Sequence, residues 1–336
     1  MLVDFSAPVA ASPAEVEAAA VSAELLGYDG FGAAETKHDV FTALTLAARA
    51  TERISLQSGI AVAFARNPMT VAILANDLQL ISGGRFRLGL GSQVKPHIER
   101  RFAMPWGRPA ARMEEFVAAL RAIWHTWATG ERLMFRGEFY RHTLMTEFFD
   151  PGPNPHGNPP VELAAVGERM TAVAGRVADG LLVHPLSSVA YLAEKLVPAL
   201  REARGGALDG FQLGLAAMVV LGADEAERSR AEQAVRRQIA FYASTPAYRG
   251  VLDLHGWGAL ADRLNALSRR QDWTAMAAEI TDEVLDTFAV AGDPAAVAAG
   301  LVERFGATID RISLYTPYEA DRHQLAAVRG ALRAAA

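Results

Sequence analysis

Strand-like and helix-like patterns alternate over the first 90 residues, and this alternation limits the folds that the chain can adopt. Short apolar runs typical of strands cover 2–6, 28–34, 54–64 and 85–90, with helical patterns between them. Connections of only a few residues between strand and helix favour a parallel sheet with helical crossovers. Four such units in so short a stretch make half of a closed eight-stranded barrel.

The second half of the chain repeats the pattern at wider spacing. Further strands are predicted at 161–165, 180–183, 211–221 and 309–315, which brings the total to eight. We therefore predict one α/β domain over residues 1–336, folded as a TIM (β/α)8 barrel.

Two stretches do not fit the repeating pattern. Residues 130–160 are rich in Pro, Gly and Asn and are predicted to form a long irregular excursion. Residues 243–290 show several helical patterns and no strand, so we predict a helical insertion before the last βα unit. A doubly wound open sheet is the alternative fold, but Ala7-Pro8 follows the first strand in place of the Gly-rich turn typical of such sheets.

Composition and charge exclude several classes of function. The chain has 33 basic and 38 acidic residues, a net charge of -5, and so lacks the excess of positive charge that is typical of nucleic-acid-binding proteins. The absence of cysteine excludes disulfides, thiolate metal sites and cysteine nucleophiles. Residues 4–10 contain no histidine, so the His-x-His metal site of barrel hydrolases is not expected. No apolar window approaches about 18 residues and no basic leader is present, so we expect no membrane partner and a cytoplasmic location.

Polar side chains gather after the predicted strands, where parallel barrels carry their functional groups. They are Glu35, Thr36, Lys37 and His38 after the second strand, Arg66 and Asn67 after the third, Ser92, Gln93, Lys95, His97 and Arg101 after the fourth, Gly167, Glu168 and Arg169 after the fifth, and His184 after the sixth. An imidazole, with its ordinary pKa of about 6.5, suits proton transfer at His38 or His97. Arg66 either binds a cofactor anion or pairs with an acid at a helix start, and we interpret His184 as structural.

The most informative motif is Ser-Gly-Gly-Arg-Phe-Arg-Leu-Gly-Leu-Gly-Ser-Gln at 82–93. Gly83-Gly84 ends the preceding helix, and an apolar strand follows. Gly89 and Gly91 then leave this strand without side chains where it enters the barrel mouth. Such glycines either let a flat ligand approach the backbone or make a tight barrel corner.

This motif, preceded by Arg66-Asn67-Pro68 and an Ala-rich helix, resembles the luciferase-like monooxygenase superfamily. Within it, the chain is most similar to the branch that uses coenzyme F420, a deazaflavin. Residues 163–170 and 178–180 resemble the family's phosphate-side loop and next strand, and 288–294 resemble the segment that leads into its last strand.

The resemblance implies an oxidoreductase that transfers hydride between F420 in the barrel mouth and a small organic substrate. A side chain would exchange the accompanying proton, and the candidates are Glu35, His38 and His97. Two alternatives stay open: an FMN-dependent monooxygenase, and a flavin-binding barrel without catalysis. The last is favoured by Thr36, which stands where some members carry His, and by the lack of an acid in 92–94. Arg66, Ser92, Gln93 and the helix-start Gly167 favour a working site.

The resemblance also implies a set of cofactor contacts. They are Ser58, Gly59, Ile60, Arg66, Asn67, Ser92, Gln93, Gly167, Glu168, Arg169 and Met170. Family members often carry a non-proline cis peptide in the third strand, which predicts one here at Gly59–Ile60 or at Ser58–Gly59. Backbone amides at the helix start after Gly167 are predicted to bind the cofactor phosphate.

We further predict that residues 243–290 lie by the barrel mouth as a lid, with 244–248 as the loop nearest the ligand. The protein is expected to form a homodimer or a higher homo-oligomer. No metal site is expected, and the identity of the substrate cannot be read from the sequence.

Overall fold

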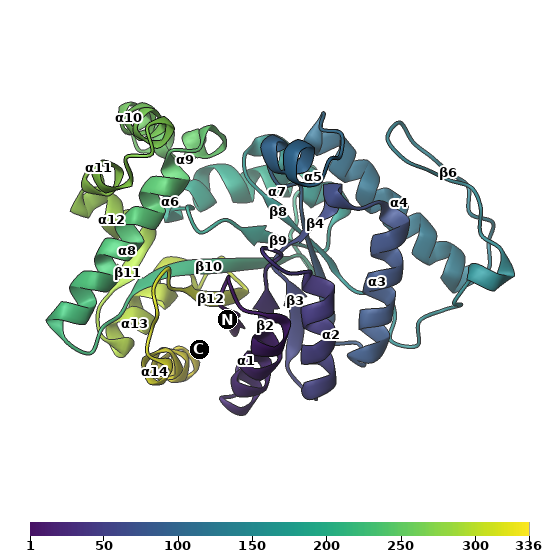
Figure 1. The fold of residues 1–336 in the computed structure, drawn as a ribbon, viewed down its shortest axis with the longest axis horizontal. Coiled ribbons are helices and arrows are strands. Elements are labelled where there is room, and N and C mark those ends of the chain that lie inside the picture. The colour runs from purple at the N-terminus through teal and green to yellow at the C-terminus, as the bar shows by residue number, and fades with distance from the viewer. Residues whose placement is uncertain (336) are drawn as a thin grey trace.

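Eight parallel strands close into a barrel in the computed structural model, which describes residues 1–335 (Figure 1). In order around the wall they are β1 (Leu2–Ser6), β2 (Gly30–Ala33), β3 (Ser55–Ser58), β5 (Phe86–Gly91), β8 (Val161–Ala165), β9 (Gly180–Val183), β10 (Gln212–Val220) and β12 (Arg311–Tyr315). Pairing of β12 with β1 closes the barrel. The predicted TIM barrel is therefore confirmed, and the alternative of an open doubly wound sheet is wrong.

The helices around the barrel begin at caps that the sequence provides. Ser12 and Glu15 form a capping box before α1 (Pro13–Leu25), Asp39 caps α2 (Val40–Ala50), and Asn67 caps α3 (Pro68–Ile81). Asn67, a predicted cofactor contact, thus uses its side-chain oxygen to accept a hydrogen bond from the Thr70 amide, at 3.0 Å.

The other barrel helices follow the later strands. They are α4 (Pro109–Thr129), α5 (Glu168–Val177), α6 (Val189–Tyr191), α7 (Val197–Ala203), α8 (Glu225–Ala243), α13 (Pro294–Phe305) and α14 (Arg322–Ala334). Short helical turns are η1 (Ala63–Ala65), η2 (His97–Arg101), η3 (Glu147–Phe149), η4 (Leu192–Leu196) and η5 (Pro246–Tyr248). Helices α6, α7 and α13 are not among the predicted elements. Within residues 1–335, no helix combines the length and apolar character that crossing a membrane requires.

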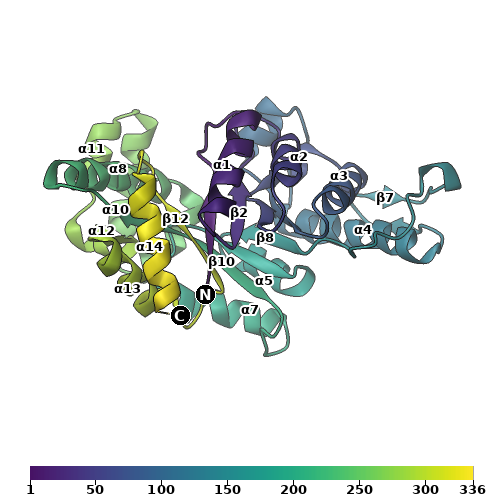
Figure 2. The ribbon, with the colours of Figure 1, turned by 90° about the horizontal axis from the view of Figure 1, so that it is seen from below.

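The excursion at 130–160 projects away from the barrel (Figure 2). It is irregular as predicted, except that β6 (Phe135–Arg136) and β7 (Arg141–His142) pair as a short antiparallel hairpin. Glu115 of α4 holds this hairpin, because its carboxylate accepts hydrogen bonds from the amides of Glu138, Phe139 and Tyr140.

The predicted insertion at 243–290 is helical. It contains α9 (Arg249–Leu254), α10 (Gly258–Arg269), α11 (Trp273–Ala278) and α12 (Asp282–Phe288). The prediction that it contains no strand is wrong at its end, where β11 (Ala289–Ala291) pairs with residues 218–220 of β10. Strand β10 runs two residues beyond its pairing with β12, which ends at Met218, and β11 occupies the edge left there. Three residues are too few to show the alternation typical of a strand.

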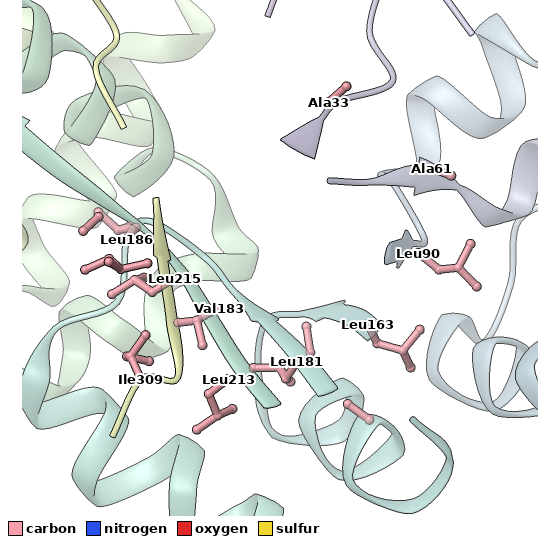
Figure 3. Packing of buried hydrophobic residues seen from close by; sticks show 14 of the residues in the cluster. Ala33, Ala61, Leu90, Leu163, Leu181, Val183, Leu186, Leu213, Leu215 and Ile309 are labelled. Carbon is pink, nitrogen blue, oxygen red and sulfur yellow. The ribbon is translucent and has the colours of Figure 1, made fainter. Parts of the chain in front are cut away.

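The main hydrophobic core lies between the barrel wall and the helices. Leu163, Leu181 and Leu213 are buried on the outer side of their strands (Figure 3). Successive strand residues point to opposite faces, so neighbours such as Leu182 and Gly214 face the barrel axis. The side chains inside the barrel are therefore not those of the main core. Their size and charge determine where a ligand can fit.

Candidate active site

A charged layer of Asp4, Arg87, Glu162 and Arg311 fills the N-terminal end of the barrel interior. Arg311 donates hydrogen bonds of 2.8 and 2.6 Å to Asp4, and Arg87 donates hydrogen bonds of 2.7 and 3.2 Å to Glu162. All four residues are at most 8% exposed, and a contact of 3.6 Å between Arg87 Nη1 and Asp4 Oδ2 joins the two pairs. A ligand inside the barrel must therefore lie on the C-terminal side of this layer.

On that side several of the interior residues are small. A Cβ added at Gly89 or Gly214 would lie 2.9 or 3.5 Å from the Leu182 side chain, so both glycines face the axis. The next interior positions are at least partly exposed, and they are Ser6, Ala164, Ala216 and Ser313. Interiors of such barrels are usually packed with bulky branched residues. The C-terminal half of this one is therefore left accessible from the mouth.

Residues 58–60, which we call the wall segment, border one side of the mouth. The Gly59–Ile60 peptide bond is cis, which confirms the prediction. The Gly59 amide donates to the Ala33 carbonyl at 2.7 Å, and the Ile60 carbonyl accepts from the Glu35 amide at 3.1 Å. The end of β2 therefore fixes the position of the wall segment.

Gly89 and Gly91 lie directly behind the wall segment. A Cβ at Gly89 would lie 1.9 Å from the Ser58 carbonyl oxygen, and one at Gly91 would lie 2.8 Å from the Ile60 side chain. The buried Ser58 hydroxyl donates to the Gly89 carbonyl and accepts from the Gly89 amide, each at 2.9 Å. Of the two interpretations of Gly89, close packing of the barrel wall is thus the one that the contacts support.

Glu35, Arg66 and Asp39 form a hydrogen-bonded cluster at the rim. Arg66 donates to both oxygens of Glu35, at 2.8 and 2.7 Å, and to Asp39 at 2.6 Å. Burial alone would raise the pKa of Asp39, but the Thr42 amide and the Arg66 guanidinium outweigh it and lower that pKa. Because Asp39 caps α2, pairing of Arg66 with an acid at a helix start is confirmed.

The three predicted catalytic side chains do not come together. Glu35 is bound at both oxygens, since Oε2 also accepts from the Val62 amide at 2.7 Å. His38 is exposed and lies near Glu15, whose pKa is lowered chiefly by Ser12 and to a smaller extent by this histidine. His97 is exposed on η2. Their catalytic roles stay predictions.

The loops after β2 and β5 meet at the mouth. Arg101 donates to the Thr36 carbonyl, and the Thr36 hydroxyl donates to the Val9 carbonyl at 2.5 Å. Thr36 therefore ties three loops together at the position where some family members carry His. Ser92 and Gln93 follow β5 and are partly exposed, and Gln93 adopts a φ of 58°.

The predicted phosphate loop lies at the start of α5. Gly167 has a φ of 77°, and no side chain in the described part of the chain caps the first turn, which begins at Glu168. The amides of a first helical turn have no partners within the helix. Burial raises the pKa of the Tyr191 hydroxyl and the Gly167 backbone beside it partly opposes that rise, which places the phenol next to this loop. The helix end thus offers donors to an anion.

A four-ring cluster of His184, Tyr242, Tyr248 and Tyr315 occupies the other side of the mouth. His184 follows β9 and Tyr315 ends β12, whereas Tyr242 comes from α8 and Tyr248 from the insertion. The His184 ring stacks on Tyr248 at 4.2 Å and meets Tyr242 edge-on at 4.5 Å between centroids. The insertion therefore lies by the barrel mouth, as predicted. Its role as a lid, with 244–248 as the loop nearest the ligand, stays a prediction.

A family model described as luciferase-like monooxygenase matches residues 3–311. The chain belongs to the luciferase-like monooxygenase family. It is 53% identical to an uncharacterized protein of Mycobacterium tuberculosis over 299 residues, 88% of this chain and 87% of that protein. It is 27% identical to the 5,10-methylenetetrahydromethanopterin reductase of Archaeoglobus fulgidus over 292 residues, 84% of this chain and 83% of that enzyme.

The coenzyme F420-dependent tetrahydromethanopterin reductase of Methanopyrus kandleri has the same fold. Its TM-score is 0.80 at 20% identity, with 98% of this chain and 97% of that chain covered. The family model and the Archaeoglobus fulgidus reductase together confirm the resemblance to luciferase-like proteins, and this luciferase-like protein is an enzyme of the oxidoreductase class.

The mouth of this luciferase-like barrel therefore has two chemically different sides. The wall segment presents backbone and small residues, whereas the four-ring cluster presents imidazole and phenol groups. Among residues 1–335, no three His, Cys, Asp or Glu side chains gather in a way that would hold a metal ion. The sequence indicates His184 at a strand end and 244–248 as the loop nearest the ligand, but nothing in it links His184 to Tyr242 and Tyr248, which lie outside the barrel strands.

Proposed function

We propose that this luciferase-like enzyme binds coenzyme F420 and transfers hydride between it and a small organic substrate. The observation that carries the proposal is the accessible barrel mouth, where the small interior residues Ser6, Ala164, Ala216 and Ser313 keep exposed surface. Relatives support it, because the Archaeoglobus fulgidus enzyme is a methylenetetrahydromethanopterin reductase and the Methanopyrus kandleri enzyme of the same fold is F420-dependent.

The residues at the mouth fit such a cofactor. When bound, a deazaflavin supplies a ring carbon that accepts or releases hydride. The backbone of the wall segment would support one face of the ring, and Ser92 and Gln93 would flank it. Amides of residues 168–170 would bind the phosphate, next to Tyr191. Exposed basic side chains at the loops after β2 and β5 would face the acidic tail, and they are Lys37, Lys95, Arg100 and Arg101.

For proton exchange we retain His38 and His97, which are both exposed at the C-terminal face. To Glu35 we assign a positioning role, because its carboxylate joins Arg66 to the Val62 amide just beyond the wall segment. The alternative is a barrel that binds F420 without catalysis. Hydride exchange distinguishes the two, because such a barrel would bind F420 but exchange no hydride with a substrate. Self-association and a cytoplasmic location stay predictions.

Replacement of Gly167 with valine is expected to weaken F420 binding at least tenfold, which is about 1.4 kcal/mol. The reason is that a branched residue is strained at the φ of 77° and would stand beside the amides of the first α5 turn. Fluorescence titration of purified protein with F420 measures the effect.

Gly205→Val is the matched control for this substitution. Gly205 has a φ of 75°, nothing lies within 4 Å of its added Cβ, and it follows α7 at the opposite face of the barrel. It should cause a similar backbone strain and leave F420 affinity within about twofold. Equal F420 affinity of the Gly167 and Gly205 variants would remove the α5 terminus from the site.

A further inference from the structure

We infer that the four-ring cluster is the substrate side of the mouth, where His184 donates a hydrogen bond to a neutral oxygen of the substrate. The substrate class is a small uncharged compound with a carbonyl or hydroxyl oxygen on an apolar body. This inference rests on the proposed function, because it places the substrate between His184 and a ring held at the wall segment.

The strand register directs His184 toward the barrel axis. A Cβ added at Gly180 would lie 3.1 Å from Glu162 of the charged layer, and Cβ atoms added at the axial Gly89 and Gly214 would lie 2.9 and 3.5 Å from the Leu182 side chain. His184 is the first residue after β9 ends at Val183, and continued alternation places it on the same side. In the barrel order, β9 stands three strands away from β3, which carries the start of the wall segment. His184 therefore faces the wall segment across the mouth.

The hydrogen bonds of His184 decide which ring nitrogen carries the proton. Its Nδ1 accepts a hydrogen bond of 3.1 Å from the Leu186 amide, so the neutral ring must carry its hydrogen on Nε2. Burial lowers the pKa of His184 to about 3, which keeps the ring neutral at physiological pH. The side chain retains some exposed surface. His184 thus offers one fixed, uncharged N–H donor.

The rings around His184 make its surroundings apolar and uncharged. Tyr248 stacks on the imidazole with an interplanar angle of 24°, and Tyr242 stands edge-on at 77°. The hydroxyls of Tyr242 and Tyr315 lie 3.2 Å apart and share a hydrogen bond. Burial raises the pKa of all three phenols, and it is the sole cause of the shifts at Tyr248 and His184. Among residues 1–335, burial is thus the cause of the lowered pKa of His184, with no contribution from a charged side chain.

This chemistry selects among possible substrates. A phosphate or carboxylate would lose water on entering the cluster and would gain no cation in return. A ketone or a secondary alcohol loses little on entry, because the rings cover its apolar body and Nε2–H satisfies its oxygen. Sugar phosphates are therefore disfavoured, and uncharged oxygenated compounds are favoured.

The first test measures the imidazole itself in the full chain labelled with ¹⁵N-histidine, using cyclohexanone as the probe. The His184 signals, assigned by their loss in His184→Phe, should show the Nε2–H form and should not titrate between pH 5 and 8. Cyclohexanone should shift the Nε2 resonance when F420 is bound. Titration near the ordinary pKa, an Nδ1–H form, or an unmoved resonance at saturating F420 would each overturn the inference.

The second test separates the substrate site from the cofactor site. His184→Phe keeps a ring but removes the donor, so binding of cyclohexanone to the F420-loaded protein should weaken at least tenfold. His184→Gln restores an N–H and should recover most of that loss. F420 affinity should stay within about twofold in both. His323→Phe, whose histidine side chain is 99% exposed on α14, is the control for the substitution itself.

The outcomes distinguish the two proposals. Failure of the wild-type protein to bind F420 overturns the proposed function and this inference with it. Binding of F420 together with unchanged cyclohexanone affinity in His184→Phe overturns only the inference. Binding of glucose 6-phosphate to the F420-loaded protein that is tighter than that of cyclohexanone and is lost in His184→Phe would also overturn it, because the cluster then recognises an anion.

Discussion

Replacement of Asp4 with alanine is expected to lower the free energy of unfolding by about 3–5 kcal/mol, the usual cost of removing one partner from a buried ion pair. Asp4 is 8% exposed and accepts two hydrogen bonds from Arg311. Its loss leaves that guanidinium buried with one hydrogen-bond partner among residues 1–335, the Ser55 hydroxyl at 3.0 Å. Chemical denaturation followed by circular dichroism measures the change.

An exposed ion pair provides the control for Asp4→Ala. Arg108 and Glu138 are in contact on the surface, with side chains 63% and 58% exposed, so Glu138→Ala should cost at most about 1 kcal/mol. The double variant Asp4→Ala with Arg311→Met should be more stable than Asp4→Ala alone, because no unpaired arginine is left at that pair. If Asp4→Ala lowers the free energy of unfolding by less than about 1 kcal/mol, the buried Asp4–Arg311 pair does not stabilise the barrel as expected here.

Gly89→Ala is expected to destabilise the protein by about 1–3 kcal/mol and to weaken F420 binding more than tenfold. The added methyl would lie 1.9 Å from the Ser58 carbonyl oxygen, which is backbone and cannot rotate away. Either β5 or the wall segment must shift, and the surface proposed to hold the cofactor ring shifts with it. Thermal unfolding and F420 titration on the same preparation report the two effects.

Gly32→Ala is the control that distinguishes the steric clash at Gly89 from the effect of replacing any strand glycine with alanine. Gly32 lies on β2, and its added Cβ would come no closer than 3.9 Å to Gln57, an ordinary contact distance. Its unfolding free energy should therefore match that of the wild type within about 0.5 kcal/mol. Equal stability of the two variants would show that the close approach at Gly89 does not matter.

The barrel could be predicted because its signals are local. Each early strand is a short apolar run, and each following helix begins at a cap that can be read within four residues, as at Ser12 and Glu15. The cis bond at Gly59–Ile60 was predicted from family resemblance and is confirmed. Strand β11 was missed because it is a strand only through its pairing with the far end of β10.

The candidate site was harder to predict, because its contacts join residues far apart in the chain. Arg66 could be assigned to an anion or to an acid, and only the fold shows that Glu35 and Asp39 already hold it. The partners of His184 come from α8 and from the insertion, more than 50 residues later, and no spacing in the sequence links them. The ends of the strands thus indicate where a site lies. The side-chain contacts formed in the folded protein determine which of those residues remain available for binding or catalysis.

The relative affinity for F420 and FMN tests the proposed cofactor most directly. Purified wild-type protein is titrated with each cofactor separately under the same conditions, and binding is followed by fluorescence. F420 should bind more tightly, because Lys37, Lys95, Arg100 and Arg101 surround the mouth where its acidic tail would lie. FMN binding at least tenfold tighter than F420, a difference of about 1.4 kcal/mol in the other direction, would contradict the assignment and favour a flavin monooxygenase.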